Sequence, residues 1–318
     1  MARSSKPREG SLQFWPRTRG KKFLPRVNWK PISLVSSDQT KFLGFIGYKV
    51  GMKSSIVKDN TEHSLTKGKK IAVPSTILEV PPMKIFSIKF YKHNKQVNEI
   101  LIGQDKELKK KVKLPKKKEI KNIDEIKDYD DLRVLVYSQV KETGIKKTPD
   151  LIELALSGTK DEKIKKLKEF MNKEIRINDV FQEGLVDLRG LTKGKGTQGP
   201  TKKFGLKLRD RKSEKGQRGP GSIGPWHPAR ITFRAPMAGQ MGFFTRLIYN
   251  NKILGFGSIK EKDINPEHGW THYGKIKTDY LILKGNVQGP AKRQILITPA
   301  LRKTKKQEKK KLEFMELR

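Results

Sequence analysis

Positive charge is distributed very unevenly along this chain, and this limits which part of it can form an ordinary globular core. Residues 99–187 hold 21 basic and 19 acidic residues, a net charge of +2, whereas the other 229 residues carry +36. Unbalanced charge of that size destabilises a compact state through self-repulsion. We therefore expect the middle segment to fold as a conventional insertion, and the flanking segments to need a polyanionic partner.

Residues 215–260, which contain no Asp or Glu, are the clearest example of such a flank. Their centre, residues 219–228, is rich in Gly and Pro and has one large aromatic residue, Trp226. The 318 residues include 71 Lys and Arg against 33 Asp and Glu, so nucleic acid, an anionic membrane and an acidic protein are the natural partners. The membrane is disfavoured because the sequence has neither an apolar span of about 20 residues nor an amphipathic anchor.

The N-terminal segment and the cysteine content indicate the compartment. Residues 1–10 contain no apolar stretch of the kind that a secretory signal requires. The sequence has no cysteine, which excludes disulfides, zinc ribbons and thiol chemistry and fits a cytosolic chain. We therefore expect a cytoplasmic protein.

The hydrophobic pattern predicts a mainly β fold with an α+β insertion. Short apolar runs separated by glycines favour a small barrel, with strands expected at residues 42–52, 54–58, 71–80, 85–91, 133–140, 185–191, 243–249, 280–284 and 294–298. Two helices are expected in the middle of the chain. One is Asp150–Leu156, after an N-capping Thr148-Pro149, and the other begins with the capping box of Thr159 and Glu162.

These patterns divide the chain into an arm, a split barrel, an insertion and a tail. The arm has four prolines, an acid-free run from residue 10 to 37 and no sustained period, so we expect it to order on its partner. The basic run Lys106–Lys118 is expected to be a solvated loop. The predicted boundaries are 1–41 for the basic extended arm, 42–82 and 177–300 for the split β-barrel with a long RNA-penetrating loop at 193–245, 83–176 for the α+β insertion, and 301–318 for the basic C-terminal tail.

Two GxGxxG patterns, at residues 194–199 and 219–224, imitate a dinucleotide-binding fingerprint. That fingerprint needs a helix that opens onto the pyrophosphate. A proline follows each pattern here, and we expect no amphipathic helix. We interpret both patterns as loop geometry and predict no nucleotide cofactor.

His268 and His272 have the spacing of two metal ligands on a helix, but Gly269 and Gly274 disfavour a helix there. The histidines have no evident Ser or Cys partner, and no carboxylate pair lies in a glycine-rich pocket. We predict no catalytic residue, no protein-bound metal and no small-molecule substrate. Mg²⁺ is expected only as an ion that bridges the protein and RNA.

Residues 193–218 hold ten basic and two acidic residues interleaved with glycines. Glycines let the backbone approach phosphates, and Lys and Arg displace their counterions, so a phosphate-tracking ribbon is favoured over a solvated loop. Trp226 is expected to stack on a base or sugar rather than to cap the barrel. The predicted RNA-binding residues are Trp15, Arg17, Arg19, Lys21, Lys22, Lys193, Lys195, Lys202, Lys203, Arg209, Arg211, Lys212, Arg218, Trp226, His227, Arg230 and Arg234.

Several strings, in order along nearly the whole chain, resemble the large-subunit ribosomal protein L3 family. They are GFIGYKVGM at residues 44–52, TKGKG at 192–196, GSIG at 221–224 and MAGQMG at 237–242. FWPR at residues 14–17, the long insertion and PWHPA at 225–229 resemble the archaeal and eukaryotic branch of that family.

The resemblance implies a closed six-stranded barrel of the translation-protein type with an α+β insertion, bound to large-subunit ribosomal RNA and to neighbouring ribosomal proteins. It also implies early binding near the 3′ end of that RNA, and a loop that reaches toward the peptidyl transferase centre with Trp226 at its tip. Eukaryotic members carry a modified histidine in this loop, but Lys203–Lys207 contains none, so that modification is not expected here.

The sequence thus predicts a non-catalytic structural constituent of the large ribosomal subunit, located on cytoplasmic ribosomes. Two other classes are open. An RNA-modifying enzyme would need a cofactor loop and a catalytic base, which the sequence does not offer. A free RNA chaperone or ribosome assembly factor has the same composition as a ribosomal protein.

Overall fold

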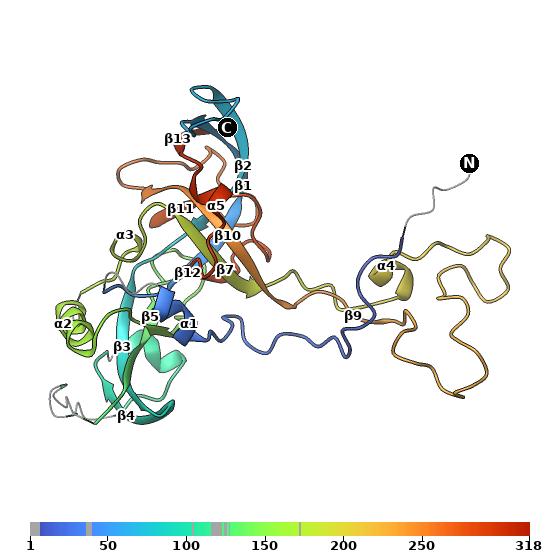
Figure 1. Ribbon diagram of the computed structural model, residues 1–318, viewed down its shortest axis with the longest axis horizontal. Helices are drawn as coiled ribbons and strands as arrows, with labels where there is room; N and C mark the ends of the chain where they lie inside the picture. Colours follow the sequence, from blue (N-terminus) through green and yellow to red (C-terminus); the bar gives the residue numbers. More distant parts are fainter. Residues whose placement is uncertain are drawn as a thin grey trace. The chain divides into compact units, whose positions relative to one another are not determined.

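The computed structural model describes residues 7–35, 40–103, 105–115, 123, 126, 128–171 and 173–318. The chain divides into two compact units, which are described separately (Figure 1). Unit 1 consists of Met1–Lys22 and Leu191–Arg246, and unit 2 of Phe23–Gly190 and Leu247–Arg318.

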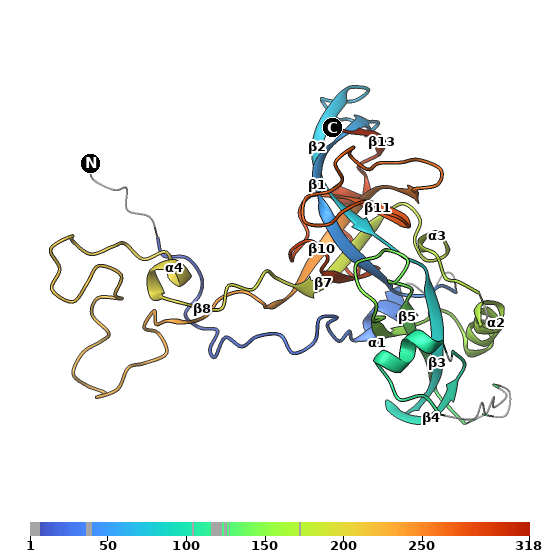
Figure 2. The ribbon, with the colours of Figure 1, turned by 180° about the vertical axis from the view of Figure 1, so that it is seen from behind.

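Six strands, chiefly of unit 2, close into a ring. Around the ring the order is β12 (Gln294–Pro299), β7 (Leu185–Leu191), β10 (Thr245–Ser258), β11 (Asp279–Lys284), β2 (Lys70–Glu79) and β1 (Phe45–Asp59). β1 then pairs with β12 in antiparallel register, Phe45 opposite Ile297, which completes the circle. The predicted mainly β fold is confirmed, and each strand predicted for the ring is present. The two strands expected at 42–52 and 54–58 are one long strand, β1 (Figure 2).

The burial of β1 changes along its length because its two halves have different neighbours. Its first six residues, Phe45–Val50, are all buried, as in a strand covered on both faces. Further on, exposed residues alternate with buried ones such as Val57, as in a strand with one face in solvent. There β1 pairs with β2 and with β13 (Leu312–Leu317) as a hairpin that continues beyond the ring.

A second sheet lies within the predicted insertion. Its order is β4 (Lys95–Leu101), β3 (Met83–Lys92), β5 (Asp131–Ser138) and β6 (Leu151–Ala155), all antiparallel. The helices named among the described residues here are η1 (Lys106–Lys110) and α2 (Lys160–Phe170), and α3 (Ile177–Val180) follows directly after the predicted insertion. α2 begins at the predicted capping box, in which Glu162 accepts a hydrogen bond from the Thr159 N–H at 3.1 Å.

The helix predicted at Asp150–Leu156 is wrong, because this segment is the strand β6. Leu154 is fully buried opposite Val134 of β5. A seven-residue helix gains few hydrogen bonds after a costly nucleation, whereas a strand pairs along its whole length. Asp150, which would be the first residue of that helix, also has a different environment. It is buried, and its carboxylate accepts a hydrogen bond from the Tyr48 hydroxyl at 2.6 Å. Burial, and then the Asp150 charge, raise the pKa of Tyr48 well above its ordinary value.

Several elements were not predicted, and three of them lie in the segments predicted as the basic arm and the basic tail. In the predicted arm, α1 (Trp29–Val35) forms because Trp29 and Ile32, three residues apart, are buried in the main core. In the predicted tail, a short helix α5 (Lys305–Glu308) precedes β13, whose Phe314 packs against the core of the hairpin. In the predicted loop Lys106–Lys118, Leu108 is buried within η1, and residues 116–118 lie outside the described residues.

Glu79, at the end of β2, is fully buried and holds the segment before β11 in place. Its carboxylate accepts hydrogen bonds from the Tyr273 hydroxyl, from the Lys277 N–H at 2.9 Å, and from the Thr278 N–H and Oγ1, each at 3.0 Å. A buried carboxylate is tolerated only when such donors replace its water. Since the four donors belong to a segment remote in sequence, this one side chain ties that segment to the ring.

Glu79→Ala is expected to lower the free energy of unfolding by about 3–5 kcal/mol, the range for breaking a buried charged network. Urea denaturation followed by circular dichroism measures this change. Glu62→Gln is the matched control, because Glu62 is exposed and its Lys311 partner is exposed too. Equal midpoints for Glu79→Ala and Glu62→Gln would contradict the assigned role of Glu79.

Candidate RNA interface

All seventeen residues predicted to bind RNA lie in unit 1. Its 78 residues include 20 Lys and Arg and three Asp and Glu, a net charge of +17. The segments that bring these residues together are far apart in the sequence, since the first 22 residues cluster with residues 191–246. The structure therefore collects in one compact unit what the sequence places in an arm and a loop.

The stem of the long loop is a narrow two-stranded ribbon. The Thr192 N–H donates to the Phe244 carbonyl at 3.0 Å, and the Lys195 N–H to the Met241 carbonyl at 3.0 Å. Further out, β8 (Thr197–Gln198) pairs with β9 (Gly239–Gln240). A Cβ at Gly242 would lie 2.1 Å from the Lys193 carbonyl oxygen, and its φ is +75°. Only glycine fits there, and it lets the two sides of the loop approach each other.

The N-terminal arm is held against the short helix α4 (Pro200–Phe204) of the loop. The Glu9 N–H donates to the Phe204 carbonyl at 2.7 Å. The Arg17 guanidinium lies 5.4 Å from the centre of the buried Phe204 ring, which is cation–π distance. Nearer the stem, the Gly20 N–H donates to the Phe243 carbonyl at 2.8 Å. The arm and the loop thus form one structure with its own small aromatic centre.

Lys203 differs from the other predicted residues because it is buried, with 6% of its surface exposed. Its ammonium lies 5.6 Å from the Trp15 ring centre and 5.1 Å from that of Phe204. Burial, and then the charge of Arg17, lower the pKa of Lys203. Trp15 in turn stacks on Phe233 at 5.6 Å. Lys203 therefore joins the arm to the loop rather than presenting its charge to solvent.

Most of the remaining predicted residues present their side chains to solvent. Arg17 and Arg209 are half-buried, and none of the other fourteen forms an ion pair with another described residue. The fourteen exposed residues are Trp15, Arg19, Lys21, Lys22, Lys193, Lys195, Lys202, Arg211, Lys212, Arg218, Trp226, His227, Arg230 and Arg234. In the insertion, by contrast, cations are paired, as in Lys163–Asp131 at 2.9 Å and Arg133–Glu153 at 3.1 Å.

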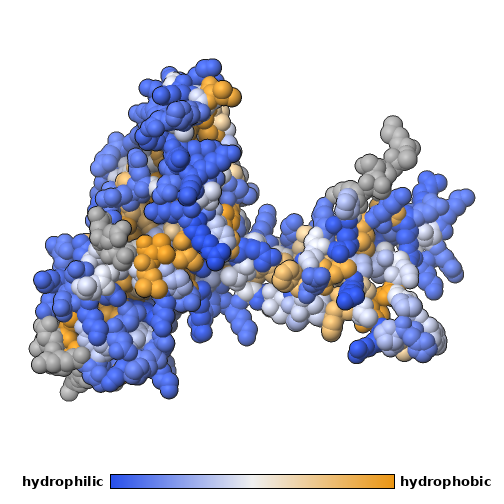
Figure 3. All heavy atoms as spheres, in the orientation of Figure 1, coloured by the Kyte–Doolittle hydropathy of each residue, from blue (hydrophilic) through white to orange (hydrophobic). Residues whose placement is uncertain are grey.

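The far part of the loop is apolar as well as basic. Trp226 is 86% exposed, and Phe233 and Ile231 are also exposed. A hollow of about 700 Å³ is lined by Ile223, Gly224, Pro225, Trp226, Ala229, Arg230 and Ile231. In unit 1, apolar side chains are interleaved with hydrophilic ones at the surface (Figure 3). Such a surface offers aromatic faces for stacking beside cations for phosphates.

Sequence reasoning missed Phe204 and Phe233 as the residues that hold the arm, and Phe14 and Arg246 beside it. Phe14 and Arg246 line a hollow of about 500 Å³ with residues of both arm and stem. The available signal was the presence of aromatic residues in basic, Gly-rich segments that have no core to bury them.

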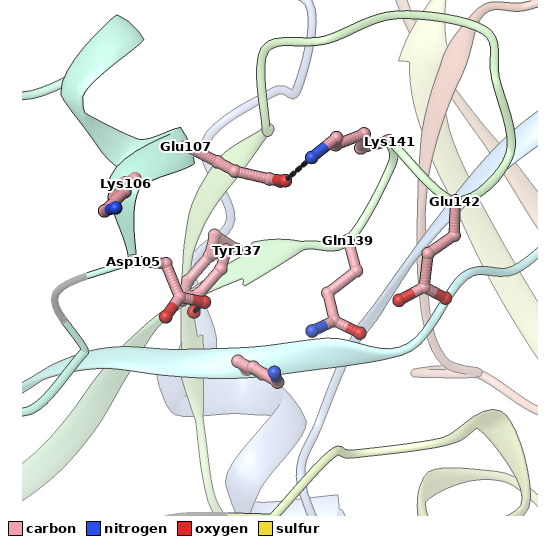
Figure 4. A pocket seen from close by; sticks show the side chains of 8 residues that line it. Asp105, Lys106, Glu107, Tyr137, Gln139, Lys141 and Glu142 are labelled. Carbon is pink, nitrogen blue, oxygen red and sulfur yellow. Dashed lines mark hydrogen bonds and ion pairs between the residues drawn. The ribbon is translucent and has the colours of Figure 1, made fainter.

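A polar hollow of about 580 Å³ in unit 2 does not resemble a catalytic site (Figure 4). Glu107 pairs with Lys141 at 2.9 Å, and the Tyr137 hydroxyl donates to Asp105. Each of these groups is satisfied by a neighbour, so the hollow presents no unpartnered catalytic group among them.

Neither of the other motifs forms a site. A short helix does follow Gly199, since this residue is the N-cap of α4 and Pro200 is its first residue. However, α4 has only five residues and follows a two-residue strand, which is not the unit of a dinucleotide fold. His268 and His272 lie in a turn, as predicted. Within the described ranges, no three His, Asp or Glu side chains gather as a metal site.

Comparison with known proteins identifies the family of this chain. A family model described as Ribosomal protein L3 matches residues 1–318. The chain belongs to the ribosomal protein L3 family. The large ribosomal subunit protein uL3 of Methanocaldococcus jannaschii is 41% identical over 313 residues, which cover 94% of this chain and 92% of that protein. The uL3 of Methanobrevibacter smithii is 38% identical over 324 residues, which cover 97% and 95%.

Membership in the L3 family decides several predictions. The family consists of structural, non-enzymatic proteins of the ribosome, so the chain is not an enzyme and the RNA-modifying class is excluded. Its place is on the ribosome in the cytoplasm, as predicted. Separately, no helix in the described part of the chain is long and apolar enough to span a bilayer.

Phe204→Ala is expected to release the N-terminal arm, because the Arg17 and Lys203 contacts both use its ring. Trypsin cleavage after Arg19 in the isolated protein should become at least about tenfold faster. This corresponds to a decrease of about 1.4 kcal/mol in the free energy needed to detach the arm from the loop. Mass spectrometry of timed digests measures that rate. Trp226→Ala removes an exposed aromatic residue of the same unit and should leave the rate unchanged. An unchanged rate in Phe204→Ala would mean that the arm does not depend on this contact.

Proposed function

We propose that this chain is a structural constituent of the large ribosomal subunit that binds large-subunit ribosomal RNA mainly through unit 1. The observation that carries the proposal is the set of exposed cations in unit 1 that form no ion pair with another described residue, beside the exposed ring of Trp226. An RNA backbone supplies the anions that these cations lack, and unstacked bases supply partners for the aromatic faces. The names of the relatives, large ribosomal subunit protein uL3, support the choice of RNA.

Mechanistically, unit 2 is a rigid base, and unit 1 offsets phosphate repulsion as the RNA compacts. Lys and Arg contacts to phosphates position a protein without reading sequence, so recognition rests on RNA shape and on single-stranded bases. Mg²⁺ takes part only by bridging RNA to the loop. We also propose that the six-stranded ring is a barrel of the translation-protein type, that the predicted boundaries of the split barrel and the insertion hold, and that binding occurs early in subunit assembly.

Within this proposal, Trp226 and its hollow lie at the tip of the loop and reach toward the peptidyl transferase centre. Lys203 has a different role from its neighbours: it positions the arm, and the exposed cations contact phosphates. Neighbouring large-subunit proteins are the other partners.

A free RNA chaperone or assembly factor is the second candidate, because it would use the same cations. Sucrose-gradient fractionation of cells separates the two. A structural constituent persists in translating ribosomes, whereas an assembly factor is confined to precursor particles.

Affinity for a large-subunit RNA transcript is expected to fall steeply with salt. About ten phosphate contacts give a log–log slope of roughly −7 to −9. Replacing Arg211 and Lys212 together with Gln should reduce that slope by roughly 1.5, since each phosphate contact contributes about 0.7–0.9. Filter binding at several salt concentrations measures the slope. The matched control replaces Lys109 and Lys110, on the exposed side of η1, with Gln. This double variant should keep the wild-type salt slope. A wild-type slope near −1 would exclude a polyelectrolyte interaction.

Trp226→Ala is expected to affect translation more than assembly, because most of the cations lie elsewhere in unit 1. The variant protein should appear in mature subunits at the wild-type level, while peptide-bond formation or drug sensitivity of those subunits changes. Quantitative mass spectrometry of purified subunits and a translation assay measure the two effects. Absence of the variant from mature subunits would contradict the assignment of Trp226 to the tip.

A further inference from the structure

Three half-buried lysines of unit 2 gather at one place on the ring. β10 and β11 pair in antiparallel register with Ile253 opposite Leu283, so Lys252 and Lys284 follow as the next neighbours across the two strands. Lys310, just before β13, is the cation whose charge acts most strongly on Lys284. Three segments of the chain thus contribute one cation each.

This arrangement is unfavourable in the protein alone. An ammonium carries three donors and no acceptor, so two charged ammoniums cannot satisfy each other. Like charges on neighbouring strands also destabilise a sheet. Burial is the main cause that lowers the pKa of Lys284, and the charges of Lys310 and Lys252 act in the same direction, whereas the charge of Asp59 opposes them. The ring therefore holds a concentrated positive charge that requires an anion.

The nearby carboxylate of Asp59 acts to raise the pKa of Lys284 but forms no ion pair with any of the three lysines. Its oxygens already accept hydrogen bonds from the Thr61 N–H at 2.9 Å, Ser64 Oγ at 2.8 Å and Thr66 Oγ1 at 2.6 Å. No described Asp or Glu lies within ion-pair distance of any of the three lysines. Asp59 is thus held in its own turn, and one carboxylate at a distance faces three cations.

We propose that Lys252, Lys284 and Lys310 form a phosphate-binding site on the ring, occupied by a backbone phosphodiester of ribosomal RNA. The inference rests on the proposed RNA binding and adds a contact in unit 2, outside the seventeen residues predicted from the sequence. Lysines bind phosphate as point charges from several directions. RNA is favoured over a free anion because successive phosphates present a dense row of charge to three cations at once.

The test compares Lys284→Gln with Lys284→Arg, which keeps the charge, and with Lys260→Gln, which removes an exposed charge elsewhere in unit 2. Lys284→Gln should reduce the salt slope of RNA-transcript binding by about 0.7–0.9, the value for one phosphate contact. The other two variants should keep the wild-type slope. In the isolated protein at low salt, Lys284→Gln should raise the thermal midpoint, because a repulsive charge is gone. Inorganic phosphate should raise the midpoint of the wild type more than that of Lys284→Gln.

The outcomes separate this site from the proposed function. A steep wild-type slope that Lys284→Gln leaves unchanged overturns the site while the RNA-binding proposal stands. A wild-type slope near −1 overturns RNA binding itself, and the thermal comparison still tests the lysine cluster. If inorganic phosphate protects the wild type selectively but RNA binding is unaffected by Lys284→Gln, the site takes a free anion and the assignment to RNA is wrong.

Discussion

The antiparallel pairing of β1 with β12 is the constraint on which the rest of unit 2 depends. It joins residues about 250 positions apart and closes the ring, and the paired Phe45 and Ile297 have no exposed surface. Burial of apolar surface is non-directional and does not need a counter-ion. The ring can therefore be stable in a chain whose formal charge is +38. The insertion sheet, the β1–β2 hairpin and the Glu79 network are all attached to strands that this closure fixes.

Unit 1 is stabilised in a different way, because it has little apolar surface to bury. Its centre consists of aromatic rings in contact with cations, as where Lys203 lies between Trp15 and Phe204. Such contacts hold the arm to the loop while most of the charge stays at the surface. The exposed Lys and Arg side chains of unit 1, which would repel one another in a core, are thus available to bind a polyanion. The lysine cluster on the ring shows that unit 2 also leaves some of its charge unneutralised.

Much of the fold could be predicted from the sequence because the ring strands carry strong apolar patterns. The elements that were missed depend on tertiary contacts. β6 was taken for a helix because Thr148-Pro149 is a good helix start, yet pairing with β5 decides the outcome. α1 and β13 are short elements within basic segments. The sequence alone does not predict them, because they form only against the cores that they cover. For the candidate interface, composition pointed to the basic arm and loop segments that cluster in unit 1. It could not predict that Lys203 is buried, because that depends on Trp15, a residue almost two hundred positions away.

The long sequence separation within the ring also bears on how the chain is made. β1 emerges early in synthesis, but it cannot pair with β12 until translation has reached residue 299. The insertion sheet has short-range pairings, such as β3 with β4 across a two-residue turn, and can form much sooner. The first half of β1, buried on both faces in the finished ring, must meanwhile remain unpaired on one edge. A growing chain of this protein thus carries an apolar strand with an unpaired edge for most of its synthesis, a condition that favours aggregation.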